Sequence, residues 1–301
     1  MKKYIVLLIL NLLTILISAQ SDIRFNNVWN QPYIINPASI TDQYLAEFNV
    51  IARQQWVGFE GSPTTLFASG TFYLDNLHTQ FGLKVMQDKI GFTSTTDIDL
   101  TYAYSLSINN AWRLNMGLGL DFQSLAYDVS MVNSSTATDP TVLTKLLNVS
   151  YINSQLGAEL TNKSWRVGIA SQNLNSLISP INKLFVNTNF MYVLYRNSRH
   201  GTFNLGYGVY GIQYSTIYQM EFNLTGYFNY TADREPIQLG LIYRTWSEVG
   251  LLVGLDISKN LRVSYSYDYN VSGISRASIG TQELMLTFRL DKAEKCINCS
   301  Y

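Results

Sequence analysis

The stretch LNMGLGLDF, residues 114–122, shows most plainly how this chain folds. Every second residue in it is large and apolar, and the residues between are polar or glycine. Because successive side chains of a strand point to opposite faces, the stretch predicts a strand with one apolar face and one polar or small face. The same period of two recurs along the chain between residues 46 and 290.

About fourteen such segments follow one another, and their lengths indicate a membrane barrel. Each is near the length of about 9–11 residues that a tilted strand needs to cross a bilayer. Strands of a soluble sandwich or propeller, the alternative, have about 5–6 residues. The segments lie near 46–56, 66–75, 78–88, 95–108, 111–124, 151–160, 164–174, 183–197, 201–213, 217–229, 236–244, 248–257, 261–270 and 281–290. We therefore predict an all-β fold, a transmembrane antiparallel β-barrel of about 14 strands.

The composition fits a secreted β protein or a β-barrel in a membrane. Apolar residues make up 47% of the chain, charged residues only 14%, and 21 residues are Tyr. A soluble domain usually carries about 25% charged residues. The 21 basic and 21 acidic residues balance, so the net charge gives no sign of a nucleic-acid partner.

Both ends of the chain differ from the barrel pattern. Residues 1–19 read as a secretory signal peptide, with Lys2 and Lys3 before an apolar run. A transmembrane anchor is the alternative, but the run is short for one. Residues 20–44 show no alternation and are expected to plug the lumen or to lie in the periplasm. The barrel is then expected over residues 45–290, with a periplasmic tail over residues 291–301.

No pattern in the chain indicates an enzyme, a cofactor or a metal site. His78 and His200 lie at predicted turns, without a nucleophile or a carboxylate at a recognisable spacing. An outer-membrane lipase, the enzyme alternative, would need a His on the rim or on the lipid face. Cys296 and Cys299 are too few ligands for a closed zinc site, so we interpret them as a tail disulfide or two free thiols.

The lengths of the connections predict which end of the barrel faces the cell exterior. Counted from the first strand, the even connections are mostly short, and the odd ones include the longest, residues 125–150. In bacterial barrels the short turns are periplasmic and the long loops extracellular, so an even number of strands puts both termini in the periplasm. Residues 53–65, 88–94 and 269–280 all belong to odd-numbered connections, so we expect them together on the outer rim.

Residues 53–70, RQQWVGFEGSPTTLFASG, hold more than a turn between two strands requires. Glycine and proline explain the break in the strand pattern. They do not explain the whole motif Arg53-x-Gln-Trp-x-Gly-x-x-Gly-x-Pro-x-Thr65. This motif resembles the PorP/SprF family of outer-membrane proteins in the type IX secretion system of Bacteroidota.

The resemblance extends over nearly the whole mature chain. Phe92 stands where the family often has Pro. Two departures matter: Gln282 replaces a frequent His, and the tail carries two Cys instead of one Cys followed by Pro. Neither departure touches the expected fold. The similar motifs are Gln31-Pro32, Asn36-Pro37-Ala38, Asp88-Lys89-Ile90-Gly91, Tyr102-Ala103-Tyr104, Leu239-Gly240, Tyr243-Arg244, Tyr265-Ser-Tyr-Asp-Tyr269 and Ser278-x-Gly280-x-x-Glu283.

The resemblance implies a protein that catalyses no reaction. Members of the family are needed for the secretion or surface attachment of type IX cargo, including gliding adhesins. The expected partners are therefore the C-terminal secretion domain of a cargo protein and other type IX components, with outer-membrane lipid around the barrel. A diffusion channel or a transporter of hydrophobic solutes is the alternative, because about fourteen strands enclose a lumen.

The partner-binding site is expected on the outer rim, where the least ordinary sequence gathers. Aromatic and Arg side chains on rigid elements are typical anchors of protein interfaces. The alternative is purely structural: Arg53 pairs with Asp268 or Glu60 in the barrel mouth, and the glycines only shape a turn. The residues expected to contribute are Arg53, Gln55, Trp56, Gly58, Gly61, Pro63, Asp88, Gly91, Asp268 and Tyr269.

Overall fold

The computed structural model describes most of the chain that follows the predicted signal peptide. The signal peptide itself, His200, Cys296, Cys299 and most of the predicted loop 125–150 lie outside the described residues. The described residues are 24–127, 148–178, 186–197, 202–228, 237–245, 247–271, 273–276 and 278–292, with Ile274 described by its backbone alone.

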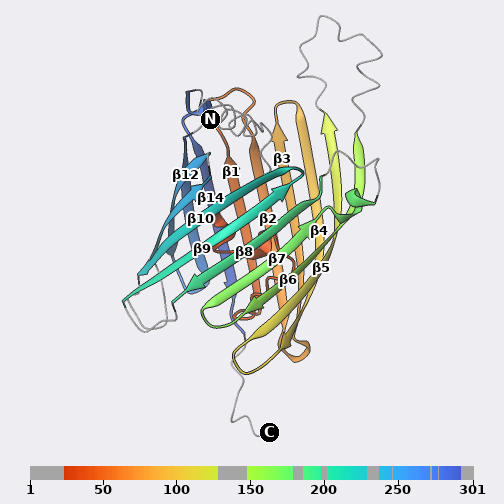
Figure 1. Ribbon diagram of the computed structural model, residues 1–301, viewed down its shortest axis with the longest axis vertical. Helices are drawn as coiled ribbons and strands as arrows, with labels where there is room; N and C mark the ends of the chain where they lie inside the picture. Colours follow the sequence, from red (N-terminus) through yellow and green to blue (C-terminus); the bar gives the residue numbers. More distant parts are fainter. Residues whose placement is uncertain are drawn as a thin grey trace, which may run out of the picture.

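Fourteen antiparallel strands close into one barrel, in which each strand pairs with its neighbours in the chain and the first pairs with the last (Figure 1). The strands are β1 (Ala46–Gln54), β2 (Thr64–Leu74), β3 (Thr79–Ile90), β4 (Thr93–Ser107), β5 (Arg113–Tyr127), β6 (Val149–Thr161), β7 (Trp165–Gln172), β8 (Thr188–Arg196), β9 (Phe203–Tyr214), β10 (Ile217–Phe228), β11 (Ile237–Arg244), β12 (Glu248–Asp256), β13 (Leu261–Asn270) and β14 (Thr281–Leu290). Short 3-10 helices are η2 (Asn26–Trp29), η3 (Pro32–Ile34), η4 (Asp75–Leu77), η6 (Leu174–Leu177) and η8 (Gly273–Arg276). The predicted fold is confirmed. None of the helices in the described part of the chain is long and apolar enough to cross a membrane.

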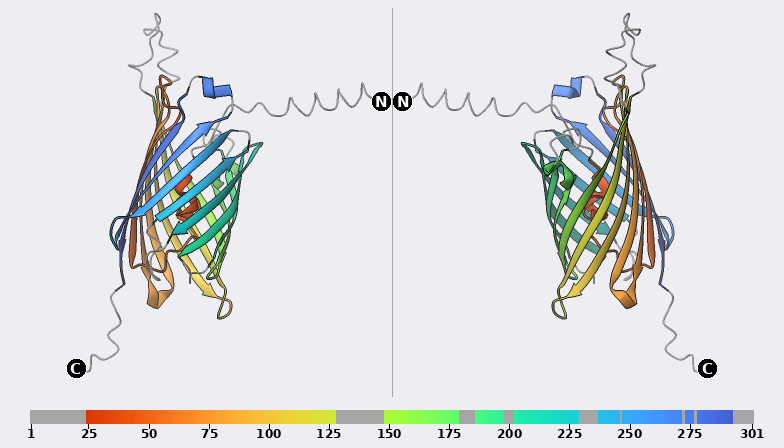
Figure 2. Two further views of the ribbon diagram at one scale, coloured as in Figure 1. Left: turned by 90° about the vertical axis from the view of Figure 1, so that its left-hand side faces the viewer. Right: turned by 90° about the vertical axis from the view of Figure 1, so that its right-hand side faces the viewer.

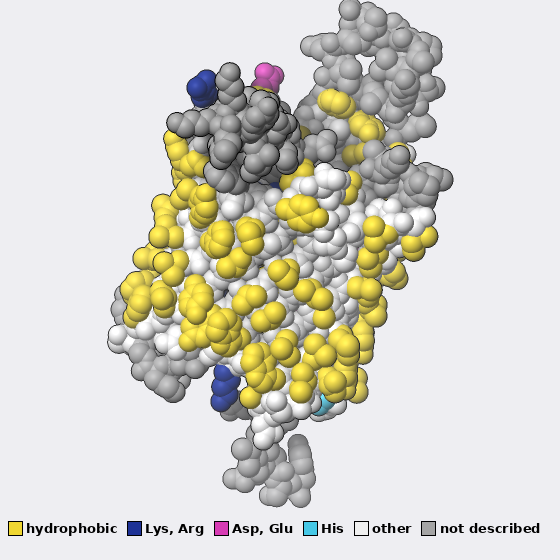
Figure 3. Space-filling model, viewed as in Figure 1, with side chains coloured by type: hydrophobic (Ala, Val, Ile, Leu, Met, Phe, Trp, Pro, Cys, Tyr) yellow, Lys and Arg dark blue, Asp and Glu magenta, His cyan; other side chains and the backbone are white. Residues whose placement is uncertain are grey.

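The alternation along β5 shows how the strand pattern builds the barrel wall. Met116, Leu118 and Leu120 are 46%, 51% and 51% exposed, whereas Asn115 and Asp121 are buried. Figure 3 shows apolar side chains spread over the outer face, with charged side chains visible only near its two ends. An outward apolar belt around a closed antiparallel barrel is the architecture of outer-membrane proteins, so the chain is an outer-membrane β-barrel.

Most strand ends lie within two residues of the sequence prediction, and the ends of β1 and β8 illustrate the differences. β1 ends at Gln54 instead of residue 56, because Trp56 has a left-handed backbone with a φ of 54°, which no strand contains. β8 begins at Thr188 instead of residue 183. Before it, the Asn187 side-chain amide donates a hydrogen bond to the Gln172 carbonyl oxygen at 2.8 Å, which fixes the end of the loop. These differences move loop boundaries and leave the topology unchanged.

The segment before β1 passes through the lumen from one rim to the other, and we call residues 24–43 the plug. Figure 2 shows its first part, with η2 and η3 in red, inside the barrel. Near the rim that carries loop 271–280, Asn26 Nδ2 donates to Asp268 of β13 at 2.7 Å. At the opposite rim, Asp42 forms an ion pair with Arg113, the first residue of β5. Of the two placements expected for this segment, the structure has the lumen.

Aromatic contacts and close backbone approaches hold the plug along its length. The ring of Phe25 lies 5.3 Å from that of Phe67 on β2, and the Trp29 ring lies 6.3 Å from that of Tyr210 on β9, measured between ring centres. A Cβ at Gly117 would lie 2.4 Å from the plug backbone, so a side chain there would collide with the plug. This small residue on the lumen face therefore makes room for the plug.

The plug separates the two ends of the described chain. β1 begins and β14 ends at the same rim, where Ala46 pairs with Leu290, as an even number of strands requires. Because the plug crosses the lumen, the described chain begins near the other rim, which carries loop 271–280. The start of β1 and the end of β14 therefore lie on one side, as expected, whereas the plug begins on the other side. Which rim faces the cell exterior stays a prediction.

Candidate functional site

Three connections that the sequence places on one rim are joined there by main-chain hydrogen bonds. The Val57 N–H donates to the Gly280 carbonyl oxygen, and the Ile279 N–H donates to the Val57 carbonyl oxygen, both at 2.8 Å. On the other side of the first loop, the Gly91 N–H donates to the Gly61 carbonyl oxygen at 3.1 Å. These bonds tie the loops into one unit, the rim platform, which comprises residues 55–63, 90–92 and 278–280.

The turns of the rim platform require glycine. Gly280 has a φ of 126°, and a Cβ there would lie 2.5 Å from the Asp268 carbonyl oxygen. Gly61 has a φ of 73°, in the left-handed region that residues with a Cβ seldom adopt. Loop geometry alone therefore explains these glycines, as the structural alternative expects.

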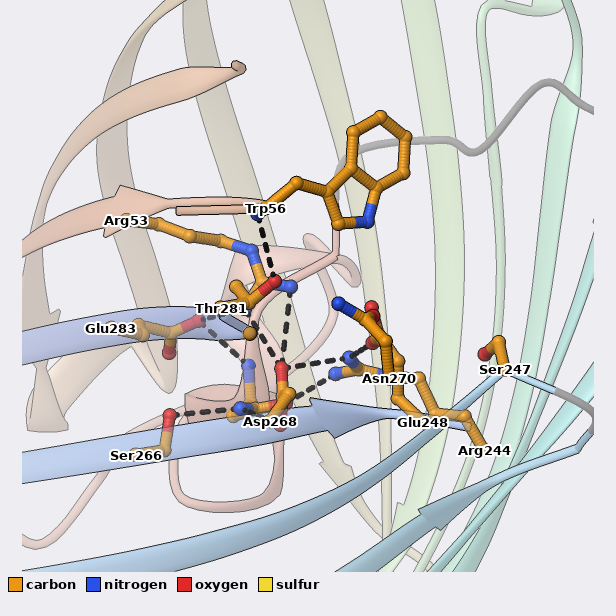
Figure 4. A network of polar contacts seen from close by, with 12 residues as sticks. Arg53, Trp56, Arg244, Ser247, Glu248, Ser266, Asp268, Asn270, Thr281 and Glu283 are labelled. Carbon is orange, nitrogen blue, oxygen red and sulfur yellow. Dashed lines mark hydrogen bonds and ion pairs between the residues drawn. The ribbon is translucent and has the colours of Figure 1, made fainter. Parts of the chain in front are cut away.

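Trp56 departs from this rule, because it combines a left-handed backbone with a large side chain. Its φ is 54°, a conformation that costs about 1–2 kcal/mol in a residue with a Cβ. The Trp56 N–H donates to Thr281 Oγ1 at 3.3 Å and so ties the turn to β14. The half-buried indole extends over the mouth of the lumen (Figure 4). A strained backbone held at one position is a reason to look for function there.

A buried ion-pair network crosses the mouth beneath the rim platform (Figure 4). Asp268 lies at its centre, 3.4 Å from the Arg53 guanidinium and 3.1 Å from the Arg244 guanidinium. Two guanidiniums thus face four carboxylates, and these six residues come from six strands. The members, all buried, are Arg53 of β1, Glu221 of β10, Arg244 of β11, Glu248 of β12, Asp268 of β13 and Glu283 of β14.

The plug supplies hydrogen-bond donors to the carboxylates of this network. The main-chain N–H groups of Asn26 and Asn27 donate to the Glu283 carboxylate at 2.9 and 3.0 Å. The Trp29 indole N–H donates to the Glu221 carboxylate at 2.5 Å. Buried carboxylates are tolerated when ion pairs and hydrogen bonds satisfy their oxygens. The position of the plug and the charge balance of the mouth therefore depend on each other.

Four of the predicted site residues take part in the wall rather than in the platform. Arg53 and Asp268 form the ion pair that the structural alternative expects. Asp88 is also buried and accepts a hydrogen bond from Thr65 Oγ1 at 2.6 Å. Tyr269 is 58% exposed and alternates to the outer face, away from the network.

The other predicted residues belong to the rim platform. The Gln55 N–H donates to the carbonyl oxygen of the buried Pro63 at 2.9 Å, which closes the base of the first loop. A partner approaching the rim can reach the half-buried indole and the exposed turns. These accessible residues are Trp56, Gly58, Gly61 and Gly91.

Sequence reasoning missed the apolar side chains that the rim platform exposes. Ile90 ends β3, and the other three stand in loops, where the period-two pattern assigns no role to an apolar residue. These side chains are Phe59, Ile90, Phe92 and Ile279, exposed by 50%, 47%, 45% and 68%.

Sequence reasoning also assigned no role to Glu221 and Glu248, which the structure buries in the network. Arg244 and Glu283 belong to motifs of the family resemblance. This resemblance was the available signal for the network, but it assigned neither residue a role. Among the residues that the structure describes, no group of three or more His, Cys, Asp or Glu is placed to hold a metal ion. His78 lies in an exposed turn after η4.

Comparison with known proteins gives one family and a set of similar folds. The family model described as "Type IX secretion system membrane protein PorP/SprF" matches residues 17–288. No curated protein matches the chain.

Among solved structures, the TodX monoaromatic hydrocarbon channel (deltaS2 mutant) has a TM-score of 0.51 at 9% identity, over 89% of this chain and 95% of that one. Omp33 of Acinetobacter baumannii has a TM-score of 0.49 at 11% identity, over 82% and 100%. The CymD monoaromatic hydrocarbon channel has a TM-score of 0.49 at 11% identity, over 92% and 95%. At these identities the likeness concerns the fold alone.

Proposed function

Because the chain belongs to the PorP/SprF family of type IX secretion system membrane proteins, we propose that it binds a secreted protein at the outer rim of its barrel. In this proposal the barrel catalyses no reaction. Its partner is the C-terminal secretion domain of a cargo protein, for example an adhesin of the gliding type. Binding holds the cargo for secretion or surface attachment, together with other type IX components.

The rim platform is the observation that carries this proposal. Trp56, Phe59 and Ile279 present apolar surface on a main chain that hydrogen bonds already hold in place. Interfaces concentrate their binding energy in such aromatic and apolar anchors, and a preordered backbone loses less entropy on binding. An apolar patch on a rim that faces water is typical of a surface that a partner covers.

The plug supports a binding role over the alternative of a diffusion channel. The Tyr33 hydroxyl lies 2.6 Å from Thr101 Oγ1 of β4, and the Asn36 amide donates to the Tyr192 hydroxyl of β8 at 3.1 Å. The plug is thus bonded to two separate parts of the wall, four strands apart. A solute passing through the lumen would have to break these buried hydrogen bonds and leave their polar groups unpaired, which is costly.

The test is to change the exposed side chains of the platform in the native host. Phe59→Asp and Trp56→Ala are expected to leave the barrel folded, as judged by its heat-modifiable mobility in gels, and to remove the cargo from the cell surface. Leu77→Asp is the matched control, because Leu77 is 60% exposed in η4, which joins strands at the opposite rim. This control should keep the cargo at the surface.

Binding measured with the purified barrel and the purified secretion domain gives the direct readout. The Phe59→Asp variant is expected to weaken the Kd by at least about tenfold, which corresponds to about 1.4 kcal/mol. Cargo at the wild-type level in both platform variants would remove the rim platform from any binding role. Loss of the folded barrel in both would assign these residues to the structural account.

A further inference from the structure

A groove lies on the membrane-facing side of β1–β4. Along the outward face of these strands, the residues Ala46, Ala68 and Gly70 are small. The register places a large apolar side chain of β1 and of β3 beside each of the two small residues of β2. The small residues therefore form a floor, and the walls are Phe48, Val50, Phe72, Phe81, Leu83 and Val85.

The size and lining of the groove fit an apolar ligand. Its volume is about 730 Å³, within the range of about 300–1,000 Å³ that small-ligand sites occupy. The wall side chains are hydrocarbon and open to the outside, with Phe48, Phe81 and Leu83 exposed by 47%, 49% and 43%. The polar residues of β2 alternate to the lumen side, where Ser69 and Thr71 are buried.

The groove is closed toward the lumen by the plug. A Cβ at Gly82, on the inner face of β3, would lie 1.9 Å from the Tyr33 hydroxyl oxygen, so the plug presses directly on this part of the wall. The Tyr33 hydroxyl is also hydrogen-bonded to Thr101 Oγ1 of β4, at 2.6 Å. A ligand of the groove consequently arrives from the bilayer.

We propose that this groove binds an acyl chain of a membrane lipid. A peptide segment is a poor occupant, because its N–H and C=O groups would need partners at membrane depth. The strands that form the floor use their own main-chain groups in the ladders between β1, β2 and β3. An acyl chain has no polar group to satisfy, and its flexible methylene chain can follow a curved apolar floor.

The groove should hold this chain longer than the rest of the outer belt does. A flat face touches a lipid chain from one side, whereas the groove touches it from the floor and from two walls. The hydrophobic effect favours neither the groove nor the flat belt, since a lipid chain in either place is surrounded by hydrocarbon. The preference comes from the larger number of close dispersion contacts in a concave site. This inference does not depend on the proposed partner binding.

The experiment fills the groove and measures lipid retention by the intact barrel. Ala68→Phe puts a ring onto the floor, and Ala52→Phe is the matched control. Ala52 also faces outward, between Leu66 and Leu284, but lies outside the groove. Both variants and the wild type are reconstituted in vesicles of phosphatidylethanolamine with a small share of the same lipid carrying a diazirine in its acyl chain. Native mass spectrometry then counts the retained lipids, and peptide mapping locates the cross-links.

The expected result is a retained lipid on the wild type and on Ala52→Phe, with cross-links concentrated on the groove walls. In a folded Ala68→Phe barrel, these cross-links should fall by about tenfold. Cross-links spread evenly around the belt would overturn the proposal, as would equal retention in Ala68→Phe and the wild type. A dimer of the wild type that Ala68→Phe abolishes would also overturn it, in favour of a second copy of the chain as the occupant.

Discussion

Replacement of Arg244 by methionine tests how far the buried network of the mouth stabilises the barrel. Arg244 is 1% exposed, and its guanidinium lies 2.5 Å from Glu221, 2.5 Å from Glu248 and 3.1 Å from Asp268. It also donates to the carboxamide oxygen of Asn26 in the plug. Methionine keeps much of the side-chain length but removes the charge and all of these bonds.

The structure indicates the size of the effect. After the substitution, Glu221 keeps the Trp29 indole N–H and Asp268 keeps Arg53, whereas Glu248 loses its ion pair. Breaking a buried ion pair from one side costs about 3–5 kcal/mol, because the remaining charge stays buried without compensation. We therefore expect a loss of about this size in the free energy of unfolding.

The matched control is Arg113→Met. Arg113 also pairs with a carboxylate of the plug, Asp42, but the two side chains are 38% and 27% exposed. Solvent screens a pair of this kind, so its loss should cost about 0–1 kcal/mol. Adding Glu248→Gln to Arg244→Met should recover part of the lost stability, because it removes the uncompensated charge.

The assay is urea unfolding of the barrel in phospholipid vesicles, followed by tryptophan fluorescence and by heat-modifiable mobility. Equal losses for Arg244→Met and Arg113→Met would refute the reasoning from burial. A double variant no more stable than Arg244→Met would show that an uncompensated Glu248 charge is not the source of the cost.

Three further predictions concern the lipid face, the plug and the orientation. Leu118→Arg should lower the free energy of unfolding by about 2–4 kcal/mol if the site is near the bilayer midplane, whereas Leu118→Phe should be tolerated; equal stability of the two would contradict the assigned alternation. Gly117→Val should displace the plug, seen as ion conductance in planar bilayers that the wild type lacks, and a silent variant would speak against the close approach at this position. A Cys at the exposed Glu60 should react with an impermeant maleimide on whole cells and a Cys at Lys163 only after lysis, and the reverse pattern would invert the orientation.

Much of the candidate site could be predicted because it follows from local pattern and parity. The turn residues show that 53–65 is a loop, and it is the first connection in the chain. Odd-numbered connections lie on one rim, so this loop was placed there with 88–94 and 269–280. The roles of single residues were not predictable in the same way. Arg53 and Asp268 looked like binding residues with a structural alternative, and the structure buries both in one ion pair. Phe59 and Ile279 were not predicted, because the period-two pattern of strands does not indicate which loop residues are exposed.

The amino-acid sequence by itself determined the barrel, because the period of two is a local property of each strand. Leu118 between Gly117 and Gly119 already specifies which face meets lipid, and the number and length of such segments specify a closed wall. Only the tertiary structure decided what fills the lumen inside this wall. The bonds between Asn26 and Asp268 and between Arg53 and Glu283 join residues 242 and 230 positions apart. Such contacts depend on barrel closure and on the path of the plug, and no short-range pattern encodes them.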